Sequence, residues 1–177
     1  MGLKEKYEKE VIPEMMKKHH LNSPMAVPKI DKVVLNVGIG RVADEGTRDL
    51  IAKQLALISG QKPKPCPAKK SIASFKSRQG SIIGLMVTLR GKRMYDFVSR
   101  FIRVALPRTR DFRGLEPKSL DSSGNLTLGV REHIVFPEII GEDVRNVFGL
   151  AITFATNSRD REKVMDTLKL LGFPFRS

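Results

Sequence analysis

The clearest chemistry in this sequence lies between Asp49 and Asp96, a stretch without any acidic residue in a chain that has 19 of them. Ten lysines and arginines fall in the same stretch. Pro63–Pro67 has a proline at every second position, and this excludes a continuous helix because each ring removes a backbone donor and clashes with the preceding turn. We therefore predict an extended, positively charged segment that attracts polyanions such as nucleic acid, with a solvated linker as the alternative.

Three segments alternate between apolar and other side chains and are predicted to be strands with one buried face: Lys29–Ile39, Ser81–Arg90 and Asn125–Arg131. In the second of them, Ile83 is assigned to the core face together with Leu85, Val87 and Leu89. The opposite faces collect side chains that are polar or basic and never acidic: Asn36, Thr88, Arg90, Thr127 and Arg131. An amide gains nothing from packing on such a face, so the sequence predicts a binding surface there.

The remaining pattern is that of helices between strands, with a fourth strand over Leu150–Asn157. Amphipathic helices are expected over residues 3–20 with a kink or restart at Pro13, over Asp44–Ile58, from Met94 to a stop at Pro107, and over Arg161–Leu171. A long polar loop, Arg108–Gly124, is expected to be functional or flexible. The alternation predicts an α+β fold, an antiparallel β-sheet with helices packed on one face.

Composition limits the classes of function. The 177 residues suit a single domain, 1–177, and the net charge of +13 exceeds what solubility requires, so a polyanionic partner is expected. The only cysteine, Cys66, excludes an internal disulfide and fits a reducing cytoplasm. No segment has the length and apolarity of a membrane span or a signal peptide, so no membrane partner is expected.

Several motifs that could indicate catalysis or cofactor binding are weak. Gly38–Ala43 matches G-x-G-x-x-A, but no acidic residue follows at the distance that a dinucleotide fold needs, so a tight turn is the simpler interpretation. The pair His19-His20 could ligate a metal, although a cationic role at a helix end is favoured. His133 beside Glu132 is more typical of a structural histidine. We expect no cofactor, no metal and no enzymatic activity.

Seven blocks resemble one family when they are read in order. They are Leu35–Gly40, Ile58–Pro63, Phe75–Gly80, Val87–Gly91, Pro107–Gly114, Gly129–Glu132 and Phe136–Glu138. This set resembles the bacterial ribosomal protein that binds 5S rRNA in the large subunit, the universal ribosomal protein family numbered five. The resemblance covers essentially the whole chain and implies an antiparallel sheet with helices, distantly like an RNA-recognition domain. The segment Pro63–Pro67 does not align with a family pattern, and its path stays open.

The resemblance also implies partners. Members of the family place 5S rRNA in the central protuberance and reach the peptidyl-site tRNA and a protein in the small-subunit head. The 5S rRNA contacts match Asn36, Gln61, Phe75 and Thr88. The loop that reaches tRNA matches Phe75–Gly84, with Lys76, Ser77, Arg78, Gln79 and Gly80 at its centre. We expect a cytoplasmic protein that is a monomer when isolated.

These residue types suit RNA. Asn36 and Gln61 offer donors and acceptors for base edges or 2′-hydroxyls, and the hydroxyl of Thr88 can do the same. Phe75 can stack on an unpaired base, although packing in the core is the alternative. Phosphate contacts without sequence information are expected from Lys69, Lys70 and Arg90. Two other functions remain open: an RNA chaperone independent of translation, and a nucleotide-dependent enzyme using Gly38–Ala43.

Overall fold

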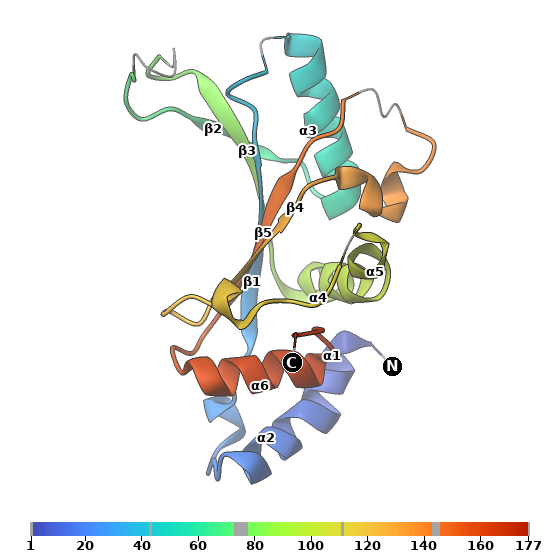
Figure 1. Cartoon of the computed structure of the whole chain (residues 1–177). Coiled ribbons are helices and arrows are strands. Elements are labelled where there is room, and N and C mark those ends of the chain that lie inside the picture. Colours follow the sequence, from blue (N-terminus) through green and yellow to red (C-terminus); the bar gives the residue numbers. More distant parts are fainter. Residues whose placement is uncertain (1, 43, 73–77, 111, 143–145, 177) are drawn as a thin grey trace. The chain divides into compact units, whose positions relative to one another are not determined.

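The computed structural model describes residues 2–42, 44–72, 78–110, 112–142 and 146–176 (Figure 1). The helices are α1 (Leu3–Lys6), α2 (Ile12–Lys18), α3 (Glu45–Ser59), α4 (Gly91–Arg100), α5 (Leu106–Arg108) and α6 (Arg161–Leu171). The strands are β1 (Ile30–Gly38), β2 (Lys64–Pro67), β3 (Ile82–Leu89), β4 (Leu126–Val130) and β5 (Leu150–Thr156). Each predicted strand and helix is present within a few residues of its expected bounds.

The strands form a five-stranded antiparallel sheet in the order β2-β3-β1-β5-β4, which confirms the predicted α+β class. Alternation along β1 follows the prediction, with Val33, Leu35 and Val37 buried and Asn36 exposed. β4 behaves in the same way. β1 and β4 therefore each present one face to the core and one to solvent, because successive side chains point to opposite sides.

The assignment of Ile83 to the core was wrong. Ile82 and Ile83 are 42% and 41% exposed. The pairing of β3 with β2 shifts between Cys66↔Gly84 and Pro67↔Ile82, so Ile83 is left without a partner in β2. An extra residue in one strand breaks the two-residue period, which is why the sequence pattern failed at this position.

The path of Pro63–Pro67 is resolved by β2, which is an edge strand of the sheet. It pairs antiparallel with β3, and Figure 1 shows the two strands side by side. Proline is tolerated in an edge strand because one side of such a strand has no ladder to complete. The prediction of an extended segment is confirmed for these residues.

The chain divides into two compact units, so the prediction of one domain over 1–177 stays a prediction. The first unit comprises residues 1–33, 89–128 and 153–177, and the second comprises 34–88 and 129–152. The core of the first unit contains a chain of four phenylalanines. Phe101 stacks on Phe97 with ring centroids 6.1 Å apart and lies 5.7 Å from Phe154, which meets Phe173 edge-on at 5.0 Å. Such pairs stabilise a core beyond the area that they bury.

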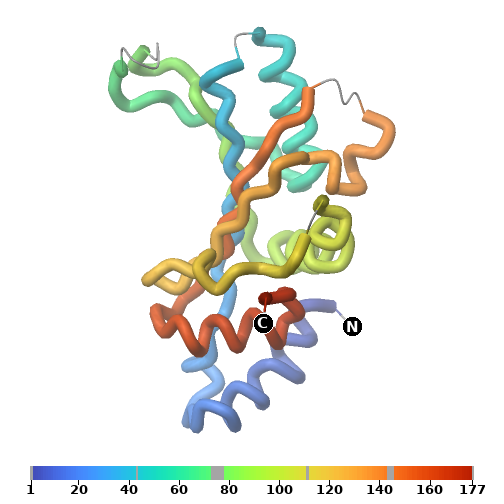
Figure 2. Tube along the Cα trace, viewed as in Figure 1, coloured from blue at the N-terminus to red at the C-terminus, as the bar shows by residue number. Residues whose placement is uncertain are grey.

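The N-terminal helices belong to the first unit and pack against α6 (Figure 2). A π-helical turn, Tyr7–Val11, joins α1 to α2, and Pro13 lies in the first turn of α2. His19 ends α2, and its Nε2 lies 2.9 Å from Oδ2 of Asp166, which also accepts a 2.7 Å contact from Lys18 Nζ. His19 thus pairs with a carboxylate at a helix end, and this agrees with the interpretation favoured over metal binding.

The helix that was expected to stop at Pro107 ends one residue later, at Arg108. α4 continues through a π-helical turn, Phe101–Ala105, into α5, so Pro107 lies in the last turn of this helix. The loop Arg108–Gly124 is held at several described points. Leu115 N–H donates to Pro174 O at 2.7 Å, and Arg161 Nη2 donates to Pro117 O at 2.7 Å.

The second unit contains α3, which is capped at both ends. Asp44 accepts a hydrogen bond from Thr47 N–H at 2.7 Å, and Gly60 ends the helix with a φ of 68°. His133 is fully buried in this unit and stacks on Phe148 with ring centroids 4.0 Å apart. Burial lowers the pKa of His133, and the Phe148 N–H donates a hydrogen bond to its Nδ1 at 3.3 Å. A buried, neutral, stacked imidazole fits a structural role.

Candidate RNA-binding surface

The open face of β1, β2 and β3 in the second unit carries the predicted binding residues. Ile39 N–H donates to Ile83 O at 2.9 Å, a bond that places Asn36 opposite Met86 in an antiparallel register. Met86 in turn faces Lys64 of β2. Residues directly opposite each other share a face, so a row of an amide, a thioether and an ammonium crosses three strands.

A second row lies beside the first one and has a gap at its centre. Gly84 is opposite Cys66, and a Cβ atom at Gly84 would lie 3.8 Å from Asn36 Oδ1 and 3.9 Å from Cys66 Cβ. It would also lie 3.3 Å from Val37 O, closer than most Cβ contacts. The absence of a side chain at Gly84 keeps this part of the face flat, so another backbone can approach Asn36 closely.

Asn36 is exposed, and its amide makes no hydrogen bond within the described part of the chain. The alternation of β1 fixes its direction, with buried neighbours Leu35 and Val37 on either side. Both its donor and its acceptor are therefore available to a ligand. The structure places this predicted site residue where the sequence pattern expected it.

Gln61 and Thr88 are brought together. Gln61 follows the end of α3, and its Nε2 donates to Thr88 O at 3.3 Å. The backbone of Gln61 is fixed by Ser59, whose Oγ donates to Gln61 O at 2.9 Å. Gln61 Oε1 and the Thr88 hydroxyl have no partner among the described residues, so both remain able to bond a ligand.

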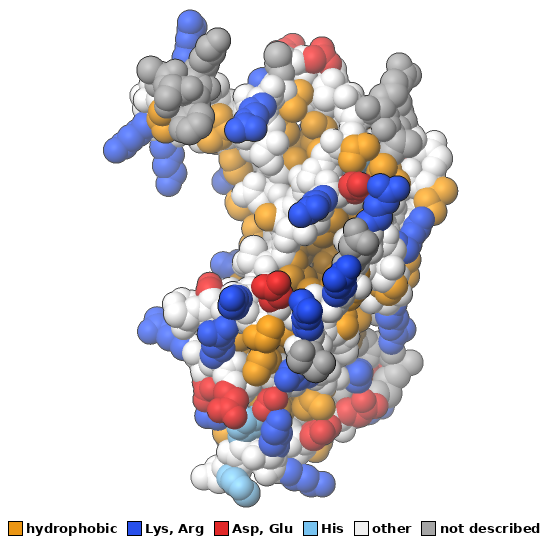
Figure 3. Space-filling view, in the orientation of Figure 1, with side chains coloured by type: hydrophobic (Ala, Val, Ile, Leu, Met, Phe, Trp, Pro, Cys, Tyr) orange, Lys and Arg blue, Asp and Glu red, His pale blue; other side chains and the backbone are white. Residues whose placement is uncertain are grey.

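The segment Gln61–Gly80, here called the basic segment, supplies cations around this face. Its described cations are exposed and form no ion pair with any described residue: Lys62, Lys64, Lys69, Lys70 and Arg78. By contrast, Lys53 in the same unit lies 4.0 Å from Glu142. Figure 3 shows lysine and arginine side chains projecting around the end of β2 and β3. Unpaired, mutually repelling cations favour binding of a polyanion.

Part of the predicted tRNA loop is described. Arg78, Gln79 and Gly80 are exposed, and the Gln79 N–H donates to Ser71 Oγ at 2.9 Å. Gly80 has a φ of 85° and donates to Ala68 O at 3.0 Å, so the return of the loop to β3 is fixed. Three predicted residues, Phe75, Lys76 and Ser77, lie outside the described residues.

The other predicted open-face residues are exposed but belong to different surroundings. Arg90 precedes α4 in the first unit. Thr127 of β4 meets Thr153 of β5, with hydroxyl oxygens 3.1 Å apart. Arg131 follows β4 in the second unit. Sequence reasoning missed Lys64, because its place on the face depends on the pairing of a proline-rich segment whose path the pattern could not give.

Other kinds of site find no support in the described parts of the chain. No group of three His, Cys, Asp or Glu side chains in them is placed to hold a metal ion. None of the helices found in these parts has the length and apolarity to cross a membrane. Gly38 ends β1, and a turn follows at Gly40 and Arg41, as the tight-turn interpretation of this glycine motif expected.

Comparison with known proteins identifies the family. Residues 23–78 match the family described as Ribosomal protein L5, and residues 82–175 match the model of the C-terminus of the same ribosomal family. The chain belongs to the ribosomal protein L5 family. It is 50% identical over 175 residues to the large ribosomal subunit protein uL5 of Anaeromyxobacter sp. strain Fw109-5, covering 98% of this chain and 97% of the relative. The proteins of the same name from Streptococcus pyogenes serotype M49 and Halothermothrix orenii are 51% and 48% identical over 174 residues, with the same coverage.

The family resemblance of the seven sequence blocks is thus confirmed. The protein is a structural component of the large ribosomal subunit that takes part in translation, and it is not an enzyme. Its place is the cytoplasmic ribosome. The remaining question is which of its surfaces contacts which partner.

Proposed function

We propose that the protein binds 5S rRNA in the central protuberance through the open face of β1, β2 and β3. Asn36, Gln61 and Thr88 supply hydrogen bonds to base edges or 2′-hydroxyls. Lys64, Lys69 and Lys70 neutralise phosphates at the margin of this face, and Arg90 and Phe75 complete the proposed set of contacts. The observation that carries the proposal is the free amide of Asn36 on a flat, acid-free face within the same unit as five unpaired cations.

The kind of RNA follows from the side chains present. Base stacking requires aromatic rings, and the described open-face residues of β1, β2 and β3 include none. Amides, a hydroxyl and lysines instead suit the shallow groove and the phosphates of a folded RNA. We therefore expect recognition of an RNA shape rather than of a splayed single strand.

The loop Lys76–Gly80 is proposed to contact the peptidyl-site tRNA, and a neighbouring surface a protein of the small-subunit head. Deletion of Ser77–Gln79 should leave 5S rRNA affinity nearly unchanged while it slows translation in a reconstituted system. Equal loss of both properties would assign the loop to 5S rRNA instead. The isolated protein is expected to be a monomer, which sedimentation equilibrium would check.

The main test replaces Asn36 by alanine. Asn36→Ala should change the free energy of unfolding by no more than about 0.5 kcal/mol, as at most exposed positions. It should weaken 5S rRNA binding by about 1–3 kcal/mol, because the RNA group that it bonded is left unpaired. The dependence of affinity on salt should not change, since Asn36 neutralises no phosphate.

The matched control is Asn22→Ala, an exposed amide in the first unit outside the proposed surface. It should alter neither unfolding nor binding. A variant of Asn36 that unfolds easily yet binds RNA normally would show that the amide is structural. Sedimentation of the wild-type protein apart from large subunits would favour an RNA chaperone that acts independently of translation.

A further inference from the structure

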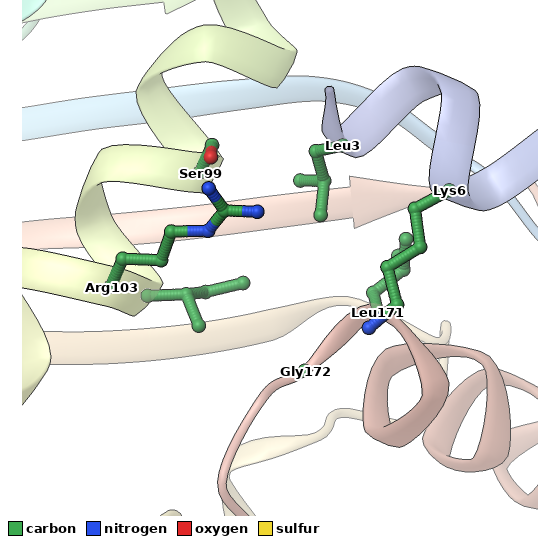
Figure 4. A pocket seen from close by; sticks show the side chains of 7 residues that line it. Leu3, Lys6, Ser99, Arg103, Leu171 and Gly172 are labelled. Carbon is green, nitrogen blue, oxygen red and sulfur yellow. The ribbon is translucent and has the colours of Figure 1, made fainter. Parts of the chain in front are cut away.

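A small pocket in the first unit lies on helices that the proposed 5S rRNA surface does not use. It has a volume of about 210 Å³ and is lined by Leu3, Lys6, Ser99, Ile102, Arg103, Leu171 and Gly172 (Figure 4). These residues come from α1, from the end of α4 and its π-helical turn, and from the end of α6. The pocket is smaller than the roughly 300–1,000 Å³ typical of cofactor sites, so it suits one or two side chains.

The walls of the pocket combine two kinds of surface. Leu3 and Leu171 are nearly fully buried, and Ile102 is half-buried, so together they make an aliphatic wall. Lys6 and Arg103 add two cations, and no acidic residue lines the pocket. Neither cation forms an ion pair within the described residues. A ligand that fits both features has an aliphatic part beside a negative charge.

The local backbone sets this pocket apart from ordinary helix packing. The π-helical turn Phe101–Ala105 contains Ile102 and Arg103, and a second π-helical turn, Tyr7–Val11, begins directly after Lys6. Such turns are rare and are found frequently at functional sites, where they redirect side chains. Figure 4 shows the Arg103 guanidinium reaching toward Leu3 and Ser99, and the Lys6 side chain running toward Leu171.

We propose that this pocket binds a short peptide segment of a partner protein in which an aliphatic side chain adjoins a carboxylate. The aliphatic side chain covers Leu3, Ile102 and Leu171, while the carboxylate pairs with Lys6 and Arg103. A nucleic acid fits less well, because a phosphate leaves the aliphatic wall uncovered and the lining residues include no aromatic ring for a base. The inference goes beyond RNA binding and does not depend on it.

The test titrates the full-length protein, labelled with ¹⁵N, with the capped tripeptide Glu-Leu-Glu. Saturating chemical-shift changes are expected at the amides of Leu3, Ser99 and Gly172. The capped tripeptides Gln-Leu-Gln and Glu-Gly-Glu, which lack the charges or the aliphatic group, should bind at least about tenfold more weakly. Absence of saturation, or equal binding of all three peptides, would overturn the proposal.

Two variants test whether the peptide binds in the pocket or responds only to the overall positive charge of the protein. Lys6→Ala/Arg103→Ala should lower the affinity for Glu-Leu-Glu at least about tenfold. The control Lys9→Ala/Lys92→Ala removes the same charge from exposed positions outside the pocket and should lower it less than about twofold. Ser99→Asp, at a half-exposed helix position, leaves the aliphatic wall intact and should also reduce binding by placing a carboxylate beside the cations. Unchanged binding by Ser99→Asp would contradict the proposal even if the double variant failed to fold.

The RNA alternative is tested with the same amides. A uridine tetranucleotide or inorganic phosphate that saturates these shifts as tightly as Glu-Leu-Glu would reassign the pocket to RNA phosphate. The same reassignment would follow if Lys6→Ala/Arg103→Ala weakened 5S rRNA binding more than its control. Normal 5S rRNA binding by this variant, with peptide binding abolished, would support the pocket proposal alone.

Discussion

The helices of the first unit and the basic segment of the second unit differ in whether their cations form ion pairs. In the helices, several cations are paired with carboxylates, as in Lys18 with Asp166 and Lys163 with Asp160, although Lys6 and Arg103 have no ionic partner among the described residues. In the basic segment, none of the described cations has an ionic partner among the described residues. The first arrangement lowers the free energy of the folded protein by itself. The second one raises it slightly by repulsion and becomes favourable only when a polyanion binds.

The same two regions also differ in how far their apolar side chains are buried. The first unit buries Phe97, Phe101, Phe154 and Phe173 in one cluster. At the basic segment, β2 has only four residues, and Ile72, Ile82 and Ile83 remain between 41% and 47% exposed. The comparison indicates that the phenylalanine cluster contributes more to stability than the basic segment does, and that the basic segment is shaped for a ligand.

The largest effect on stability is expected from the phenylalanine cluster. Phe154→Ala should lower the free energy of unfolding by about 3–5 kcal/mol, because it removes a fully buried ring and leaves a cavity. Ile83→Ala, an apolar truncation at the exposed bulge of β3, should cost less than about 1 kcal/mol. Denaturant unfolding of both variants measures the difference. Similar losses would show that the bulge is part of the core.

A second large effect is expected where the backbone of the first unit is tightly packed. Gly124 has a φ of 81°, and a Cβ atom there would collide with the Ser158 carbonyl oxygen. Gly124→Ala should therefore cost about 2–4 kcal/mol. The control Gly129→Ala, in β4 with open space around the position, should stay within about 0.5 kcal/mol. Thermal unfolding measures the stability of both variants. A larger loss of stability in Gly129→Ala than in Gly124→Ala would contradict the prediction.

The ionic contact between α2 and α6 predicts a smaller, pH-dependent effect. Burial raises the pKa of Asp166, but hydrogen bonds and charge from Lys18 and His19 outweigh it and lower the pKa overall. A lowered pKa in the folded state adds stability above the ordinary Asp value of about 3.9, and this stability is lost as the pH falls through the folded pKa.

Asp166→Asn should thus reduce the free energy of unfolding by about 1–2 kcal/mol at neutral pH, with the difference shrinking below about pH 4. Urea unfolding across this pH range provides the measurement. Asp96→Asn, an exposed carboxylate on α4, serves as the control and should show little effect at any pH. If the difference in unfolding free energy between wild type and Asp166→Asn stayed constant with pH, the carboxylate charge would not be its cause.

The smallest effect on stability is expected in the basic segment. Lys69→Ala/Lys70→Ala should leave the free energy of unfolding within about 0.5 kcal/mol, because neither side chain has a described ionic partner. The slope of log affinity for 5S rRNA against log salt should fall by about 0.7–0.9 for each phosphate that is no longer neutralised. Lys9→Ala/Lys17→Ala, two exposed positions on the N-terminal helices, should leave the slope unchanged. An unaltered slope in the first variant would exclude Lys69 and Lys70 from the interface.

The sequence was sufficient wherever one local rule governed a segment. Alternation placed Asn36 and Thr88 on the face away from the core, and apolar periodicity predicted a helix over Asp44–Ile58, close to the bounds of α3. The rule failed at Ile83, because a bulge depends on the partner strand as well as on β3 itself.

The parts of the site that depend on pairing could not be predicted. Lys64 joins the open face only because β2 pairs with β3, and a run with alternating prolines gives no periodic signal for that pairing. The bond from Gln61 to Thr88 joins residues 27 positions apart and requires the turn after α3 to be known. The residue types in the sequence were enough to predict which groups each side chain can bond. Which side chains lie beside one another could be known only from the fold.

The prolines of β2 have a consequence for the protein before it meets RNA. Backbone N–H groups alternate between the two edges of a strand, and the Ala68 N–H points to Ser81 of β3. Pro65 and Pro67 therefore occupy the outward positions of β2, where they offer carbonyl groups but no donors. A strand from a second copy cannot form a ladder along this edge, so newly made protein is protected from edge-to-edge aggregation although its sheet is open there.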